Sequence, residues 1–279
     1  MLEHLVGWAP PGTLLFHNWV EGLVLFFTLV DQFPELAALC AMPNHVHVLG
    51  EWPDAEERLV VAEGAYARWR NTARGESGAV WARHPPISRV VDDAHVRRTV
   101  RYIHLNPVRE HLVGCPLEWP LSTHRDACGL VIAPVVPRAR NPEEFHRYVS
   151  SDPDAQVDGT PFPQLTRQDA VLAAALAAAS STGRFTLGEL RRRGAARSHA
   201  IGTACLAGLG DASLLAAALD LSRSRAAAHV AAAPTHVRGI GVARSLLTAA
   251  TVLNDPRFSA LNEGDLRESP GWRRFRNSR

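Results

Sequence analysis

The sequence has no lysine, few cysteines and no long apolar run among its 279 residues. All 30 basic residues are therefore arginine, so any phosphate contact would use a guanidinium fork rather than an ammonium point charge. The cysteines form no CxxC pair, which argues against a disulfide scaffold or a zinc ribbon and fits a reducing cytoplasm. No segment approaches the roughly 18 apolar residues of a membrane span, and no basic signal region is seen near the N-terminus, so we expect a cytoplasmic protein without a membrane partner.

What is present is ordinary for a folded protein. Hydrophobic residues make up 46% of the chain and charged residues 21%, which excludes wholesale disorder. The length exceeds that of one average domain, so we expect two domains. Shifts in composition predict a mixed α and β domain at residues 1–130, a proline-rich linker at 131–165, a helical domain at 166–254 and a basic tail at 255–279.

The apolar pattern of the first 130 residues predicts an α+β fold, with an all-α region after the linker. The expected elements are a strand at residues 2–7, a helix at 19–33, an apolar run at 36–42, a strand at 44–50, a helix at 54–74 and a helix from Asp92 or Asp93 to about Asn106. Proline and asparagine favour turns, so Pro43 and Asn44 are expected to close a hairpin between the apolar run and the next strand. A short helix is expected at 143–149 inside the linker.

Two histidines with one residue between them are the sharpest chemical feature. In a strand, side chains two apart point to the same face, so His45 and His47 would converge while Val46 packs into the core. Two neutral imidazoles at that spacing suit a divalent metal, although a site needs a third ligand. The alternative is a pair of surface histidines on an edge strand.

A tyrosine and an asparagine form the second feature. Tyr102 and Asn106 are four residues apart, so a helix would present a phenol and an amide oxygen on one face. Both have structural alternatives. A tyrosine on a helix often fills the core, and Asn106 before Pro107 is also the pattern of an N-cap that starts a second short helix.

Together these segments resemble a known family. Residues 42–49, Met-Pro-Asn-His-Val-His-Val-Leu, followed by residues 102–109, Tyr-Ile-His-Leu-Asn-Pro-Val-Arg, are similar to the single-tyrosine HUH transposases, which include insertion-sequence transposases and their REP-associated relatives. Residues 119–123, Trp-Pro-Leu-Ser-Thr, look like the closing motif of that family. The resemblance covers roughly residues 2–130. Thr123 and His124 stand where the family more often has serine and tyrosine.

The resemblance implies a ferredoxin-like domain with both histidines on a central antiparallel strand. It implies Tyr102 as the nucleophile and Asn106 as the third ligand, beside His45 and His47, of Mg²⁺ or Mn²⁺. It also implies single-stranded or hairpin DNA as the partner and a 5′-phosphotyrosine link. The chemistry suits the residues, because a divalent ion polarises a scissile phosphate and a phenol can form a covalent intermediate.

Arginines gather around these residues. Between positions 65 and 110 there are nine arginines and four acids, a local excess of five positive charges. Such a cluster suits phosphate contacts, and the alternative for each arginine is a solvated helix face. The candidates for DNA contacts are Arg68, Arg98, Arg101 and Arg109. Trp69 and Trp81 lie among them and would either stack on bases or fill the core.

The helical region after residue 166 allows a helix-turn-helix. Residues 212–219 would form its first helix and residues 223–232 its recognition helix, with Arg223, Arg225 and His229 facing duplex DNA. This segment faintly resembles the C-terminal DNA-binding domain of the bacterial replication initiator. The alternative is an alanine-rich bundle without a specific function.

Two functions therefore compete. The first is a metal-dependent transposase that nicks and rejoins DNA, and the intact set of His45, His47, Tyr102 and Asn106 favours it. The second is a domesticated DNA- or RNA-binding regulator that kept the fold and lost turnover. The sequence leaves open the target DNA, the metal used in the cell and whether a homodimer builds the site.

Overall fold

A four-stranded antiparallel sheet forms the centre of the N-terminal half. The computed structural model describes residues 1–82, 87–131, 134–158 and 168–231, except positions 193, 208 and 210. The strands are β1 (Glu3–Trp8), β2 (Ala38–Ala41), β3 (His45–Gly50) and β4 (Ser88–Arg89). They lie in the order β2-β3-β1-β4, and each neighbouring pair is antiparallel. The strands expected near residues 2–7 and 44–50 are confirmed.

Two helices in the connections complete the topology. Helix α1 (Trp19–Gln32) joins β1 to β2, and α2 (Ala55–Arg74) joins β3 to β4. The order β-α-β-β-α-β with the first and third strands central is the ferredoxin-like arrangement. Helix α2 packs on the face of the sheet that carries Gly7 and Val46, because a Cβ added at Gly7 would lie 2.5 Å from a carboxylate oxygen of Glu63 and 3.2 Å from Val46. The α+β fold expected from the sequence is confirmed.

The expected hairpin joins β2 to β3. Backbone N–H of Met42 donates to the carbonyl of His45 over 2.8 Å and closes the turn. The carbonyls of the two turn residues are also satisfied, since Pro43 accepts from Leu15 and Asn44 accepts from Ala9. These bonds fix the start of β3 and, with it, the direction in which His45 points.

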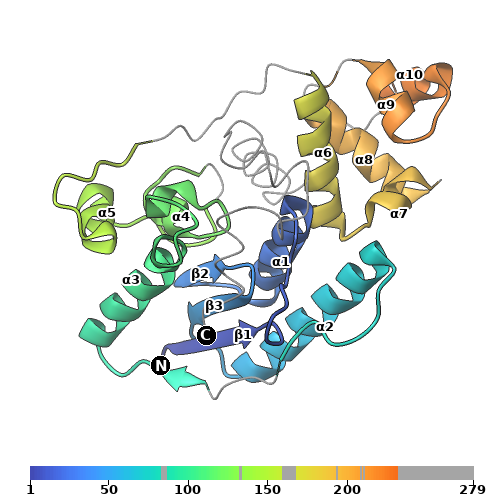
Figure 1. Ribbon diagram of the computed structural model, residues 1–279. Helices are drawn as coiled ribbons and strands as arrows, with labels where there is room; N and C mark the ends of the chain where they lie inside the picture. Colours follow the sequence, from blue (N-terminus) through green and yellow to red (C-terminus); the bar gives the residue numbers. More distant parts are fainter. Residues whose placement is uncertain are drawn as a thin grey trace.

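The remaining chain of the described part is mainly helical. Its elements are α3 (Asp93–Arg109), η1 (Pro116–Glu118), α4 (His124–Ala127), α5 (Pro142–Ser150), α6 (Gln168–Gly183), α7 (Leu187–Arg191), α8 (Ala195–Leu206), α9 (Ala212–Ala218) and α10 (Arg223–Ala231). Figure 1 shows α3, α4 and α5 grouped at one side of the sheet and α6 to α10 beyond α1. Helix α5 confirms the short helix expected in the linker. The predicted basic tail lies outside the described residues, and within them no helix is long and apolar enough to cross a membrane.

Helix α3 runs further than the sequence predicts. Asp92 caps its start by accepting from the N–H of His95 over 2.7 Å. The helix was expected to end or kink near Asn106, but it continues through Pro107 to Arg109. Pro107 lacks the N–H that would donate to the Ile103 carbonyl, but backbone N–H of Glu110 still donates to the Asn106 carbonyl over 3.0 Å, so the helix continues past the proline. The alternative of Asn106 as the N-cap of a second helix is therefore wrong.

Helix α6 connects the two halves of the chain. Ala174 and Ala177 of this helix belong to the same buried cluster as the sheet and α1, against which α6 packs. Its other face contributes Val171 and Ala175 to a second cluster built with α8, α9 and α10. An ion pair between Arg184 and Asp31, 2.8 Å long, adds a polar contact near the end of α1. The small alanine side chains allow this close packing on both faces.

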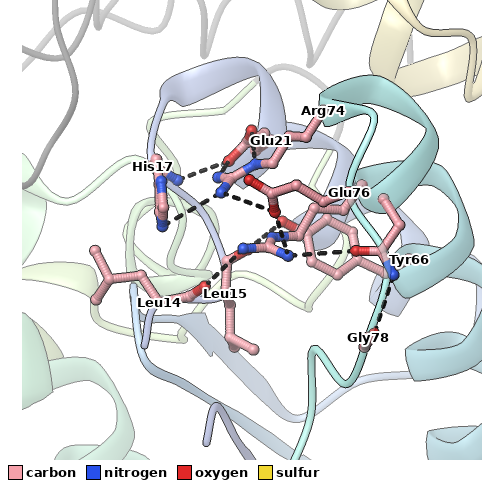
Figure 2. Close-up of polar contacts among 10 residues, drawn as sticks. Leu14, Leu15, His17, Glu21, Tyr66, Arg74, Glu76 and Gly78 are labelled. Carbon is pink, nitrogen blue, oxygen red and sulfur yellow. Dashed lines mark hydrogen bonds and ion pairs between the residues drawn. The ribbon is translucent and has the colours of Figure 1, made fainter. Parts of the chain in front are cut away.

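A buried ion pair ties the end of α2 to the start of α1. The Arg74 guanidinium donates to both carboxylate oxygens of Glu21, and the backbone N–H of His17 donates to the same carboxylate over 2.7 Å (Figure 2). Nearby, the buried Tyr66 hydroxyl donates to the Leu15 carbonyl over 2.8 Å. Arg70 donates to the Leu14 carbonyl. These contacts anchor the loop before α1. Arg70 and Arg74, at the end of α2, therefore stabilise the fold.

Glu63 of α2 gives a pH-dependent prediction. Burial raises the pKa of this carboxyl to about 8, so the folded chain keeps a proton that the unfolded chain releases between about pH 4.5 and 8. Stability is therefore lost as the pH rises through that window. We expect the difference in the free energy of unfolding between Glu63→Gln and the wild type to grow, in favour of Glu63→Gln, by about 1 kcal/mol from about pH 6 to 7. Urea unfolding measures this difference. The exposed Glu57→Gln on the same helix is the control, and equal pH profiles for the wild type and Glu63→Gln would contradict the prediction.

Candidate functional site

Two imidazoles and one amide meet between β3 and α3. His45 and His47 point to the face of the sheet next to α3, whereas Val46, between them, enters the core on the other face. Asn106 reaches the rings from α3, and its Nδ2 lies 2.6 Å from His47 Nε2 and 3.2 Å from His45 Nε2. All three polar side chains are buried. The structure therefore brings together the three residues that the sequence suggested as ligands.

A hydrogen bond on the far nitrogen orients each ring. His45 Nδ1 lies 2.6 Å from the Asn44 side-chain oxygen, so it donates there and leaves a lone pair on Nε2. His47 Nδ1 lies 3.1 Å from His4 Nε2. With His47 donating to His4, the Nε2 lone pair of His47 faces the Asn106 amide. Such outer partners commonly orient metal-binding histidines.

Burial keeps these imidazoles neutral. It lowers the pKa of His45 to about 3, and burial followed by the charge of His95 lowers the pKa of His4 to about 4. The pKa of His47 also lies well below its ordinary value, because of burial and then repulsion from His45 and His4. At neutral pH the rings are uncharged, which is the state that a divalent metal binds.

The spacing of the three groups fits a divalent ion. Neighbouring ligands of an octahedral ion with bonds of about 2.1 Å lie roughly 3 Å apart. The separations of 2.6 and 3.2 Å between Asn106 and the two ring nitrogens lie on either side of that value. A half-turn of the Asn106 amide exchanges its nitrogen and oxygen and gives the site an oxygen ligand. His45, His47 and Asn106 are therefore the residues that could hold such an ion.

Tyr102 stands at the edge of this group. Its side chain is 39% exposed, which leaves the phenol open to a large substrate. Its ring lies edge-on to His47, with 5.2 Å between the ring centres, and 6.4 Å from the ring of His4. The guanidinium carbon of Arg109 lies 5.2 Å from the centre of the Tyr102 ring. A half-exposed phenol thus sits between a buried imidazole and an exposed cation.

The other predicted DNA contacts lie in different surroundings. Arg98 is exposed on α3, the helix of Tyr102. Arg68 is exposed on α2, which packs on the opposite face of the sheet. Arg101 donates from Nε to the Tyr148 carbonyl over 2.9 Å, so part of its guanidinium binds α5. Of the predicted set, Arg98 and Arg109 share the helix of Tyr102 and remain exposed.

Trp8 is a candidate that sequence reasoning missed. It pairs with His45 across β1 and β3, and its ring stacks on that imidazole with 4.4 Å between centres. The indole is 38% exposed, as a platform for a nucleic-acid base requires. Trp69 is buried in the core, and the Trp81 indole donates to the Glu63 carbonyl over 3.0 Å. The alternation of His4 and Trp8 along the first strand could have placed both on the face of His45.

The predicted helix-turn-helix region consists of α9 and α10, which pack on each other. Asp211 caps α9 by accepting from Ser213 over 2.7 Å, and Asp220 in the turn adopts a left-handed conformation with φ of 54°. Arg223 and Arg225 are exposed on α10. Their role in DNA binding stays a prediction.

A second group of metal-binding residue types was also missed. His124, Cys128 and His146 are buried, and one ligand atom from each lies within 4.8 Å of the others. The sequence reasoning searched for paired cysteines and found none. The signal was instead a histidine and a cysteine four residues apart, with a second histidine beyond the predicted domain boundary.

Comparison with known proteins gives a distant similarity. The chain is 26% identical to the Haemophilus influenzae protein named "Putative REP-associated tyrosine transposase" over 111 residues, which cover 34% of this chain and 63% of that protein. The match thus spans less than two thirds of that relative. No family profile and no solved structure matches the chain. The similarity gives weak support to the resemblance seen in the motifs and supports a transposase-like function at the family level alone.

Proposed function

We propose that this protein is a single-tyrosine DNA transposase or nickase that cleaves and rejoins single-stranded or hairpin DNA with the help of a divalent ion. The observation that carries the proposal is the half-exposed Tyr102 beside His47, whose Nε2 shares the Asn106 amide with His45. A nucleophile and three convergent ligand groups are the parts that metal-assisted phosphodiester transfer requires. The distant transposase relative agrees with this chemistry.

Each residue has a distinct part in the proposed reaction. The Tyr102 oxygen attacks phosphorus, which breaks the bond to the 3′ oxygen and leaves a phosphotyrosine at the 5′ end. A later attack by a DNA 3′-hydroxyl on that phosphotyrosine releases the Tyr102 oxygen and rejoins the strand. A divalent ion held by His45, His47 and Asn106 would supply positive charge to the non-bridging oxygens of the phosphate. Arg109, beside the phenol, is placed to bind the same or the next phosphate.

The surroundings of Tyr102 favour an unpaired strand. Trp8 offers an exposed indole face next to His45, and a base can stack there only when it is free of its duplex partner. Arg98 and Arg109 on α3 supply charge for the backbone without reading sequence. A hairpin with a single-stranded flank presents both features, a phosphate to attack and an unstacked base beside it.

The C-terminal helices provide a second proposed contact. Exposed Arg223 and Arg225 on α10 would bind duplex DNA beside the cleaved strand. Removing residues after 130 would test this poorly, because α5 packs on α3 and α6 packs on α1. Substituting both arginines with alanine in the full chain leaves that packing in place.

The proposed function is tested by covalent capture. We expect the wild-type protein, incubated with a fluorescent hairpin oligonucleotide and Mg²⁺ or Mn²⁺, to form a DNA adduct that withstands denaturing electrophoresis. Chelation of the metal should abolish the adduct, and His47→Ala should reduce it about 100-fold or more, because one ligand and the orientation of the site are lost.

The exposed Glu57→Ala on α2 is the control and should retain full activity, while thermal unfolding verifies that each variant folds. An adduct that persists in chelator would contradict the metal-dependent site. Tight hairpin binding by the wild type with no adduct under either metal would instead indicate the domesticated regulator.

A further inference from the structure

A second buried cluster lies on the opposite face of α3 from Tyr102. His124 lies in α4, Cys128 directly follows that helix, and His146 lies in α5. One ligand atom from each lies within 4.8 Å of the others, and all three side chains are buried. We propose that His124, Cys128 and His146 hold a structural zinc ion, with Cys115 as the fourth ligand.

The distances within the cluster are close to those of a zinc site. His124 Nε2 lies 3.0 Å from His146 Nδ1 and 3.7 Å from Cys128 Sγ. Around tetrahedral zinc, with bonds of about 2.1 Å to nitrogen and 2.3 Å to sulfur, two nitrogens lie roughly 3.4 Å apart and nitrogen and sulfur roughly 3.6 Å apart. Two of the three separations therefore lie within a few tenths of an ångström of those around zinc, and the third, between Cys128 and His146, is within 4.8 Å.

A relay of hydrogen bonds directs the His124 lone pair into the cluster. The Thr123 hydroxyl donates to the Leu39 carbonyl over 3.3 Å and accepts from the Leu39 N–H over 2.9 Å. It also accepts from His104 Nε2 over 3.1 Å, which leaves His104 Nδ1 as the acceptor for His124 Nδ1, 3.4 Å away. His124 Nε2 then carries the lone pair. This outer partner plays the role that His4 plays for His47.

Cys115 is the candidate for the fourth ligand. It precedes η1, and its Sγ lies 3.7 Å from His146 Nε2, on the same ring that contributes Nδ1. Its side chain packs against the small cluster that contains Cys128, but its sulfur contacts the His146 nitrogen that faces away from the ion, so binding as the fourth ligand requires this side chain to turn. Structural zinc sites have four ligands, and two thiolates would neutralise the charge of the ion.

The surrounding helical segments are short. Helix α4 has four residues and η1 has three, too few for a stable helix without outside contacts. Their own buried cluster consists of Leu117, Cys128 and Leu130. Zinc binding adds folding free energy to such segments. Since η1 and α5 both pack on α3, the ion would also support the helix that carries Tyr102.

The ligand chemistry separates this site from the one near Tyr102. Thiolate with imidazole selects zinc, whereas the site near Tyr102 offers two imidazoles, one amide and no thiolate. The zinc proposal can therefore be tested independently of the proposed transposase activity. Cobalt is a suitable probe for this test. Co²⁺ bound by thiolates gives an intense charge-transfer band in the near ultraviolet, which nitrogen and oxygen ligands do not give.

The wild-type protein supplies the first test without any substitution. Full-length protein purified without chelator should contain about one zinc per chain by elemental analysis. After exchange with Co²⁺ it should show the thiolate band. Protein without tightly bound zinc, or a cobalt spectrum without that band, would overturn the proposal.

Matched cysteine substitutions then assign the ligands. Cys128→Ser and Cys115→Ser should each reduce the band to roughly half, and the double variant should remove it. Cys205→Ser, on α8 outside the cluster, should leave it unchanged. His45→Ala should also keep the full band. That result would show that the band does not arise from cobalt bound at the site near Tyr102. A full band in Cys115→Ser would remove Cys115 from the ligand set.

Discussion

Replacing Tyr102 with phenylalanine is expected to abolish covalent adduct formation with hairpin DNA, by about 10³-fold or more, while binding persists. The substitution deletes the attacking oxygen and with it the whole covalent route. It keeps the ring that lies edge-on to His47 and near the Arg109 guanidinium, so the local packing should remain. Electrophoresis under denaturing conditions measures the adduct, and a mobility shift under native conditions measures binding.

The two other tyrosines make this a sharp test. Tyr66 is fully buried and donates to the Leu15 carbonyl, so it cannot reach DNA without unfolding. Tyr148 is 41% exposed on α5 and is the matched control. Tyr148→Phe should form the adduct at the wild-type rate. A Tyr102→Phe protein that still forms it, together with loss in Tyr148→Phe, would identify Tyr148 as the nucleophile.

Local signals explain why much of the fold and the main candidate residues could be predicted. The hairpin depends on Pro43 and Asn44, which favour a turn wherever they occur together. The convergence of His45 and His47 follows from the period of a strand, and the pairing of Tyr102 with Asn106 follows from the period of a helix. Each inference depends only on residues that are close together in the sequence and requires no knowledge of contacts between distant segments.

Contacts between distant segments explain what was missed. His4 and Trp8 join the site because β1 pairs with β3, and their own segment carries no motif. The cluster of His124, Cys128 and His146 forms because α5 returns to α3 across a proline-rich stretch that reads as a linker. The local excess of arginine was also a poor guide to which side chains are available for phosphate contacts. Arg74 belonged to the basic set considered for phosphate contacts, yet its guanidinium binds Glu21 inside the protein.

Proline shows how tertiary packing overrides a local rule. Pro107 was expected to end or kink α3, and a proline in the middle of a helix would do so. Here the helix continues to Arg109 despite the donor that Pro107 lacks, and Ile103 and Pro107 are both buried. The continued helix holds Asn106 in register with Tyr102, four residues earlier. The geometry of the candidate site therefore depends on a helix end that sequence alone misplaces.

The buried ion pair gives the largest expected effect on stability. Arg74→Ala should lower the free energy of unfolding by about 3–5 kcal/mol, because it leaves the Glu21 carboxylate buried without its guanidinium. Both side chains are largely buried, at 12% and 6% exposure, so water replaces the lost partner poorly. Urea unfolding followed by circular dichroism measures the loss.

The controls separate the lost charge from the lost side chain. Arg68→Ala removes an exposed arginine from the same helix and should change stability by less than about 0.5 kcal/mol. Adding Glu21→Gln to Arg74→Ala should recover part of the loss, since a neutral amide is cheaper to bury than an unpaired carboxylate and can still accept from the His17 N–H. A double variant as unstable as the sum of the two single variants would show that the pair is not coupled. An Arg74→Ala protein within about 1 kcal/mol of the wild type would show that the loop before α1 is held by the Tyr66 and Arg70 bonds instead.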